Sequence, residues 1–352
     1  MKIKVGIIGA TGYTGNELLR LLMRHPKVEI NALSSHSFEG KMYSEVYQNY
    51  TQLCETVLVS EDEAIEKSEV VFACLSSGLS EKIAGKCLGK KKLFIDLGSD
   101  LRLSDREEYK QWYGLDFINE QVHANAVYCI PELNRRKLTE IASAKTTGLI
   151  ANPGCYPTAA ALALAPLIDG ATPMIDLNTI IIDAKSGVTG AGRTPSSATH
   201  FPELNEGLSA YKVAEHRHTP EIEQTLSGLA GRKVRVVFVP HLLPINRGIL
   251  TTVYANALDT DLSGIRNIFA DYYKNSGFVR ILKSGVTANL KSVKYSNYCD
   301  ISLHFDVRTN RVIIMSVIDN MIKGAAGQAI QNMNIALGLP ENAGLDYIPP
   351  SF

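Results

Sequence analysis

A short apolar strand, a glycine-rich turn and an amphipathic helix at the N-terminus constrain the fold of this chain most strongly. Residues 2–8 are mostly apolar and β-branched, which is typical of a buried parallel strand. Glycines stand at positions 6, 9, 12 and 15, and leucines at helical spacing follow in residues 16–24. Glycines in this context let backbone N–H groups approach a pyrophosphate at the helix N-terminus. The segment predicts a dinucleotide-binding βα unit, because the alternative, a plain βα turn, needs far fewer glycines.

Strands and helices alternate through the first part of the chain. Apolar runs at residues 28–33, 70–75 and 93–97 are separated by helical patterns, which predicts an α/β fold with a Rossmann-like, doubly wound parallel sheet. Consecutive strands then predict an α+β domain with a largely antiparallel sheet; they lie at residues 178–186, 234–239, 249–255, 301–307 and 311–318, with one helix near 261–274. We expect the nucleotide-binding domain at residues 1–153 and 323–352, and a catalytic and oligomerisation domain at 154–322.

Charge and cysteine usage limit the classes of partner. Lys plus Arg and Asp plus Glu are both 36, so no net field attracts nucleic acid or an acidic membrane surface. The six cysteines are scattered without metal-ligand spacing, which predicts no metal site and suits a reducing compartment. The N-terminus has no signal-peptide pattern and no apolar run is long enough to span a bilayer. We therefore expect a cytoplasmic protein that acts on a small molecule.

The end of the second strand bears on the choice of cofactor. An NAD-specific site places Asp or Glu there, whereas this chain has Ser34 and Ser35, with Lys41 soon after and no arginine between. Hydroxyls and a cation suit a 2′-phosphate, so NADP is favoured over NAD; a plain polar loop is the alternative. Ser76 and Ser77 follow a later strand in another small-residue turn of the kind that approaches a cofactor.

One cysteine stands at a strand-to-helix junction near the middle of the chain. Residues 152–154 read Asn-Pro-Gly, a turn, and the alanines and leucines of residues 159–165 predict a helix, with Pro157 in its first turn. Unpaired N–H groups and the helix dipole at Cys155 favour a thiolate. A lone cysteine is usually a small buried residue, but this local geometry favours a nucleophile.

Five segments together resemble one enzyme family. Ile150–Pro166, with its Pro-Gly-Cys-Tyr-Pro-Thr core, resembles the active-site signature of the N-acetyl-γ-glutamyl-phosphate reductase family, NADP-dependent enzymes of arginine biosynthesis. Gly9–Gly15, Ser186–Arg193, His216–Ile222 and Lys323–Gly327 are also similar to motifs of that family. The resemblance extends over essentially the whole chain, and it implies an architecture and covalent chemistry shared with aspartate-semialdehyde dehydrogenase.

The resemblance implies reduction of an acyl phosphate to an aldehyde through a thioester on Cys155. The chemistry of the residues agrees, because the reaction needs a nucleophile, a hydride donor and an acid. A histidine can activate a thiol and donate a proton, and His218 is favoured over His216 because Glu221, three positions later, could orient its ring. A pair of surface histidines before a helix is the alternative.

The remaining candidates divide into two groups. The cofactor-binding candidates are Gly9, Thr11, Gly12, Tyr13, Thr14, Gly15, Ser34, Ser35, Lys41, Ser76, Ser77, Gly187 and Asn320. The substrate-binding candidates, which would meet a phosphate and an α-carboxylate, are Arg102, Asn134, Arg193 and Arg217. Spacing leaves open which arginine meets which anion, and an ordinary surface arginine is an equal alternative for each.

Two other functions remain open on the residues alone. The nearest is a related reductase that acts on aspartyl phosphate or on a carrier-bound aminoadipyl phosphate, because these enzymes would share the cysteine. The other is a non-enzymatic NADP-binding regulator on the same fold. Besides the substrate and inorganic phosphate, we expect the partner to be further copies of the chain, in a homodimer or homotetramer.

Overall fold

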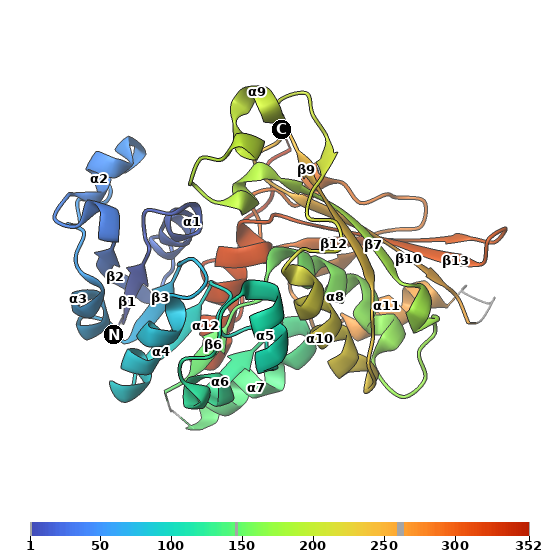
Figure 1. Cartoon of the computed structure of the whole chain (residues 1–352), viewed down its shortest axis with the longest axis horizontal. Coiled ribbons are helices and arrows are strands. Elements are labelled where there is room, and N and C mark those ends of the chain that lie inside the picture. The colour runs from blue at the N-terminus through green and yellow to red at the C-terminus, as the bar shows by residue number, and fades with distance from the viewer. Residues whose placement is uncertain (1, 145–146, 259–263, 352) are drawn as a thin grey trace. The chain divides into compact units, whose positions relative to one another are not determined.

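The protein is described by a computed structural model of residues 2–144, 147–258 and 264–351 (Figure 1). It forms two compact units, Met1–Pro153 with Ala325–Asp346, and Gly154–Gly324 with Tyr347–Phe352. Residues 323–324 and 347–351, which we expected in the nucleotide-binding domain, group with the second unit. Each unit has its own sheet.

The first unit contains a six-stranded sheet in the order β2-β1-β3-β4-β6-β5, with every neighbouring pair parallel. The strands are β1 (Ile3–Ile8), β2 (Val28–Ser34), β3 (Val70–Ala73), β4 (Leu93–Asp96), β5 (Ala126–Tyr128) and β6 (Leu149–Ala151). The helices are α1 (Tyr13–Leu22), α2 (Tyr43–Val46), α3 (Glu61–Glu66), α4 (Ser80–Gly89), α5 (Arg106–Tyr113), α6 (Glu120–Asn125), α7 (Pro131–Ala144) and α12 (Gly327–Ala336). The predicted doubly wound parallel sheet is confirmed.

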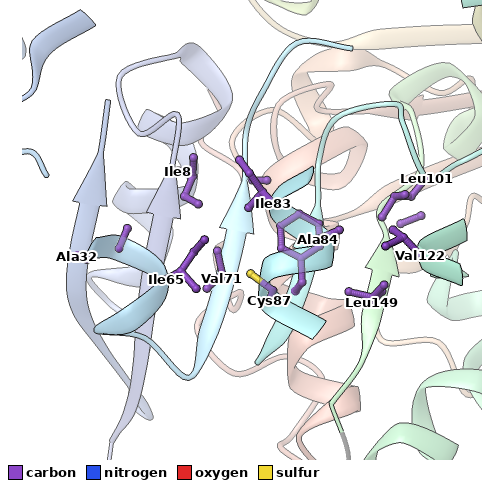
Figure 2. Close-up of a cluster of buried hydrophobic side chains, with 14 residues drawn as sticks. Ile8, Ala32, Ile65, Val71, Ile83, Ala84, Cys87, Leu101, Val122 and Leu149 are labelled. Carbon is purple, nitrogen blue, oxygen red and sulfur yellow. The ribbon is translucent and has the colours of Figure 1, made fainter. Parts of the chain in front are cut away.

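The core of this unit forms because its central strands are apolar along their whole length. All four residues of β3 are buried, as expected for a parallel strand covered on both faces. Figure 2 shows Val71 of that strand beside Ile65, Ile83 and Cys87, which come from helices of the same unit. Each fully buried aliphatic side chain stabilises the fold by about 1.5–3 kcal/mol.

Helix α12, near the end of the chain, completes the first unit. α12 packs against α1 and α7. The sequence pattern of residues 128–135 predicts a loop, and this prediction is wrong, because α7 begins at Pro131. Proline is well tolerated in the first turn of a helix, where its missing N–H has no intrahelical partner. Asn134 departs from helical geometry inside α7, with φ −138° and ψ 35°.

The second unit contains a seven-stranded sheet in the order β11-β12-β13-β10-β7-β9-β8. Its strands are β7 (Ile181–Gly187), β8 (Ser209–Ala210), β9 (Val237–Leu243), β10 (Ile249–Asn256), β11 (Val279–Ile281), β12 (Cys299–Asp306) and β13 (Arg311–Ile318). Four neighbouring pairs are antiparallel, and only β7–β9 and β11–β12 are parallel. The prediction of a largely antiparallel sheet is confirmed.

Helices α8 (Cys155–Ile168), α9 (Phe201–Leu204), α10 (His218–Ala230) and α11 (Ile265–Tyr272) belong to the second unit. α8 packs on β10 and β13, and both α10 and α11 contact it (Figure 1). Every residue of α8 after Cys155 is buried, which explains why its sequence is apolar on all sides. The predicted helix near 261–274 is α11, and residues 259–263 lie outside the described part of the chain.

A π-helix, η7 (Ile322–Ala326), joins β13 to α12. π-helical turns are rare and occur frequently at functional sites. In the described part of the chain, no helix has both the length and the apolar character that crossing a membrane requires.

Candidate active site

Cys155 is the first residue of α8, immediately after the N-cap residue Gly154. Its side chain is half-buried, whereas four of the other five cysteines are buried. Gly324 of η7 approaches it closely, since a Cβ at that glycine would lie 2.7 Å from the Cys155 Cβ. The Cys155 sulfur therefore lies at the N-terminal end of α8, where the peptide dipoles favour negative charge, and Gly324 leaves little room beside it.

Glu221 contacts the backbone that carries Cys155. It lies in the first turn of α10 and is fully buried. Its Oε1 accepts a hydrogen bond of 2.7 Å from the N–H of Gly154. We expected this carboxylate to orient the His218 ring; the bond to Gly154 gives it a second task, which is to hold the start of α8.

Two tyrosines and two histidines form a connected group beside Cys155. The N–H of His218 donates to His216 Nδ1 at 3.0 Å. His216 Nε2 lies 3.4 Å from Tyr211 Oη, which lies 3.2 Å from Tyr156 Oη. Tyr156 and Tyr211 were not among the predicted site residues. The adjacency of Tyr156 to Cys155 was the only sequence signal for either, and it does not by itself indicate a contact.

Burial controls the titration of this group. Burial, with a further contribution from the nearby cations of Lys212 and Arg217, lowers the pKa of His216 from 6.5 to about 4. Burial, with a smaller contribution from charge on Cys155, raises the pKa of Tyr211 from 10.0 to about 12. His216 is therefore neutral at physiological pH, and the Tyr211 hydroxyl keeps its proton.

In the first unit, the glycine turn of residues 9–15 has the geometry of a phosphate-binding loop. Gly9 has φ +75°, and a Cβ there would lie 2.4 Å from the Cys74 carbonyl oxygen. A Cβ on Gly15 would lie 2.3 Å from the Gly9 carbonyl oxygen. A Cβ on Gly12, the N-cap of α1, would have only the Gly9 oxygen within 4 Å, at 3.5 Å. Two glycines thus permit close backbone packing and the third leaves open space at the helix N-terminus, where Tyr13 and Thr14 begin α1.

Two tyrosines that sequence reasoning missed hold this turn in place. Tyr43 Oη donates to the Ala10 carbonyl at 3.1 Å, and Tyr47 Oη donates to the Thr11 carbonyl at 2.9 Å. Tyr43 is fully buried, and its ring stacks on that of Tyr47. Their spacing of four residues was the available signal, because it places both on one side of a helical turn.

The serines after β2 are buried rather than open. Ser34 and Ser35 are 1% and 4% exposed, and the Ser35 hydroxyl lies 2.7 Å from the Thr11 hydroxyl. The Ser34 carbonyl accepts hydrogen bonds from Gly9 and Ala10 N–H groups. Lys41 is exposed. The end of β2 carries no carboxylate, and its Ser34 carbonyl and Ser35 hydroxyl support the glycine turn.

The turn after β3 is fixed by a neighbouring loop. Ser76 is exposed, and the Ser77 hydroxyl lies 2.6 Å from that of Ser99. Asp100 accepts hydrogen bonds from the N–H groups of Gly78 and Ser80, at 2.7 and 2.8 Å. These contacts leave Ser76 as the side chain of this turn most open to a ligand.

Asn320 and Gly187 have structural tasks in the second unit. Asn320 Oδ1 accepts the Gly248 N–H at 2.7 Å, and its Nδ2 donates to Thr189 Oγ1 at 3.1 Å. A Cβ on Gly187 would lie 2.7 Å from the Asn246 carbonyl oxygen, so glycine is needed there for close packing. Both residues hold together the loops that follow β7 and β9.

The four substrate-binding candidates fall in different surroundings. Arg102 and Asn134 belong to the first unit, and Arg193 and Arg217 to the second. Arg102 is buried and its Nη2 donates to the Leu97 carbonyl at 3.0 Å, while Asn134 Nδ2 donates to the Tyr128 carbonyl at 2.8 Å. Arg193 and Arg217 are exposed, and Arg217 directly precedes α10. The described residues contain no group of three or more His, Cys, Asp or Glu side chains that could hold a metal ion.

Comparison with known protein families matches both parts of the chain. Residues 4–141 match the semialdehyde dehydrogenase NAD binding domain, and residues 155–320 match the semialdehyde dehydrogenase dimerisation domain. N-acetyl-gamma-glutamyl-phosphate reductases of Brachyspira hyodysenteriae and Clostridium botulinum are 55% and 52% identical, over 99% of this chain and 100% of theirs. That of Pelotomaculum thermopropionicum is 50% identical over 98% of both chains.

Solved structures resemble this fold at low sequence identity. Aspartate semialdehyde dehydrogenase II from Vibrio cholerae aligns with a TM-score of 0.72 and 16% identity, covering 96% of this chain and 99% of that one. Aspartate semialdehyde dehydrogenase with NADP from Candida albicans aligns with a TM-score of 0.70 and 15% identity, over the same shares. At such identities the likeness concerns the fold alone.

Proposed function

The chain belongs to the family of N-acetyl-γ-glutamyl-phosphate reductases, and from that membership we propose that it reduces N-acetyl-γ-glutamyl phosphate to N-acetylglutamate 5-semialdehyde and phosphate, a step of arginine biosynthesis. It is an oxidoreductase with a semialdehyde dehydrogenase NAD binding domain. One observation carries the reaction: half-buried Cys155 begins α8, beside two histidines and the buried carboxylate of Glu221.

We assign NADP as the cofactor. The glycine turn fits a dinucleotide, because a Cβ at Gly12 would occupy open space at the start of α1. The absence of a carboxylate at the end of β2, and the exposed cation of Lys41, favour the 2′-phosphate over a free 2′-hydroxyl. When bound, the reduced nicotinamide supplies the hydride for the thioester. Gly9 to Gly15 would hold the pyrophosphate, and Ser76, exposed in the turn after β3, would be a further cofactor contact.

Cys155 performs the covalent step. Its thiolate attacks the acyl carbon, a C–S bond forms, and the bond from carbon to the phosphate oxygen breaks, releasing inorganic phosphate. After reduction of the thioester carbonyl, the oxygen carries the new negative charge and the C–S bond breaks to give the aldehyde and the thiolate. The helix start at Cys155 stabilises the thiolate at both ends of this cycle.

His218 is the proposed acid–base residue. His216 is less suited, because its Nδ1 already accepts the His218 N–H and burial lowers its pKa to about 4. The His218 ring lies with its centroid 5.8 Å from that of Tyr156, the neighbour of Cys155. In the proposed reaction it takes the thiol proton, donates it to the oxygen of the reduced adduct, and takes it back as the C–S bond breaks and the aldehyde forms.

Exposed arginines are the proposed anchors for the two anionic groups of the substrate. Arg217 lies between the two histidines in sequence, and Arg193 ends the loop after β7. Both are exposed and can present a bidentate fork to a phosphate or a carboxylate. Arg102 and Asn134, which belong to the first unit, are also proposed substrate-binding residues.

One assay separates this activity from the alternatives. Phosphate-dependent reduction of NADP should proceed with N-acetylglutamate semialdehyde and be far slower with aspartate semialdehyde. A preference for the second substrate would identify the aspartyl-phosphate enzyme, and no turnover with either would favour a regulator. Cys155→Ser should abolish turnover in the same assay.

We further propose a homodimer or homotetramer, on the strength of the match to a dimerisation domain over residues 155–320. A cytoplasmic location is consistent with a biosynthetic enzyme in which all six cysteines are free thiols.

A further inference from the structure

A chain of hydrogen bonds joins the start of α8 to the start of α10. It begins at Tyr156, next to Cys155, and passes from Tyr156 Oη to Tyr211 Oη (3.2 Å) and on to His216 Nε2 (3.4 Å). It ends where His216 Nδ1 accepts the N–H of His218, the first residue of α10, at 3.0 Å. One end of the chain of hydrogen bonds is therefore the residue next to Cys155, the proposed nucleophile. The other end is the backbone N–H of His218, the proposed acid–base residue.

One arrangement of protons satisfies every contact in this chain. The His218 N–H is a donor, so His216 Nδ1 must be unprotonated and the neutral ring carries its proton on Nε2. That proton is donated to Tyr211, whose hydroxyl donates to Tyr156, and Tyr156 donates to the His241 carbonyl at 3.5 Å. Both nitrogens of His216 are therefore used within the protein, which leaves none to bind a substrate anion.

The rings are also held by packing. The His216 ring meets Tyr156 edge-on, with centroids 5.4 Å apart and planes at 87°. Its centroid lies 4.9 Å from that of the His218 ring and 5.5 Å from that of the Phe238 ring in β9. Tyr211 directly follows β8, and its N–H donates to the Pro240 carbonyl of β9 at 3.1 Å. The chain of rings is therefore attached to β9 through Tyr211 and Phe238.

We propose that Tyr211 and His216 are positioning residues that fix the separation between Cys155 and His218. The proposal deepens, and rests on, the assignment of Cys155 as nucleophile and His218 as acid–base residue. Proton transfer needs heavy atoms within about 2.6–3.2 Å, and a misplacement of about 1 Å can cost about 100-fold in rate. A brace between the two helix starts holds that geometry before substrate arrives.

The experiment compares Tyr211→Phe, His216→Ala and the double variant with a matched control, Tyr273→Phe. The Tyr273 hydroxyl donates to the Leu162 carbonyl at 2.7 Å, so the control removes a tyrosine hydroxyl from the middle of α8, away from Cys155. Each brace variant should lower kcat by about 10- to 100-fold, the usual effect of residues that orient a reacting group. KM should change by less than about threefold, because the brace acts on the separation of Cys155 and His218 and not on substrate binding.

Non-additivity is the readout that a merely structural role would not produce. If both residues act through one brace, the double variant should have the kcat of the worse single variant. The rate at which iodoacetamide labels Cys155 in the free enzyme should depend on pH differently in Tyr211→Phe than in the parent. In Tyr273→Phe this pH dependence should be the same as in the parent. The NADPH dissociation constant should stay the same in all four proteins.

Three results would overturn the brace. One is an effect of Tyr211→Phe on KM alone, which would make it a substrate contact. Another is multiplication of the two kcat losses in the double variant, and the third is an equal loss in Tyr273→Phe, which would indicate general loosening of α8. Normal turnover by Cys155→Ser would instead refute the proposed function itself, whereas an inactive Cys155→Ser with a fully active Tyr211→Phe refutes the brace only.

Discussion

Replacing His216 by asparagine should remove a measurable part of the pH dependence of stability. Burial lowers the pKa of His216 in the folded state to about 4, from 6.5, and the cations of Lys212 and Arg217 act in the same direction. The other groups that face the ring are the hydroxyls of Tyr211 and Tyr156 and the ring of His218. The unfolded chain therefore binds the proton more tightly than the folded one, and stability falls as the pH drops from 6.5 toward 4.

The size of this loss follows from the two pKa values. For a single group with pKa 6.5 unfolded and about 4 folded, lowering the pH from 7.5 to 5 costs about 2 kcal/mol of unfolding free energy. Asparagine does not titrate, and its Oδ1 can still accept the N–H of His218 two residues on, as in an Asx turn. The variant should thus be less pH-dependent than the parent by about 2 kcal/mol over this range.

Urea unfolding of both proteins at pH 7.5 and pH 5, followed by tyrosine fluorescence and circular dichroism, measures the difference. Other titrating groups cancel in the comparison of the two proteins. His36→Asn, at an exposed position, serves as the control for loss of a histidine. Equal pH dependence of His216→Asn and the parent would refute the reasoning, and so would an NMR titration of the His216 ring centred near 6.5.

Three further substitutions test other parts of the account. Gly324→Ala places a methyl group 2.7 Å from the Cys155 Cβ, so kcat should fall by about tenfold or more while the circular dichroism spectrum stays the same. The control is Gly228→Ala, which has open space around it and should keep full activity. Tyr47→Phe removes a hydrogen bond of 2.9 Å to the glycine turn and should weaken NADPH binding by about two- to tenfold in a fluorescence titration. Unchanged affinity would argue against a role of Tyr47 in holding the glycine turn. Burial raises the pKa of Asp96 to about 6, so the protein should lose stability as the pH rises from about 4 to 6, and Asp96→Asn should abolish that loss in urea unfolding.

The sequence was sufficient for the fold class because the relevant signals are local. The alternation of strands and helices predicted the parallel sheet, and the turn at residues 152–154 with the apolar run behind it placed Cys155 at a helix start. The start of α7 was misread because Pro131 is compatible with both a turn and the first turn of a helix. Only the residues that follow it, and their packing against α12, decide between the two.

The contacts of the candidate site could not be predicted, because they join residues far apart in the chain. Glu221 and Gly154 are 67 positions apart, and Tyr156 and Tyr211 are 55 apart. No local pattern reports such a pairing; it exists because α8 and α10 pack against each other. For the same reason the sequence left His216 as the second acid–base candidate, whereas both of its ring nitrogens are hydrogen-bonded within the protein.

The central claim is that the acyl group is transferred to Cys155, and mass spectrometry tests it most directly. The enzyme is mixed with N-acetyl-γ-glutamyl phosphate without NADPH, quenched in acid and digested. We predict phosphate release equal to about one per site, and an N-acetylglutamyl thioester on the peptide that contains Cys155 and on no other cysteine peptide. Adding NADPH before the quench should remove the adduct, and Cys155→Ser should release no phosphate in the burst. Full turnover with no adduct on Cys155, or activity that survives in Cys155→Ser, would contradict the account.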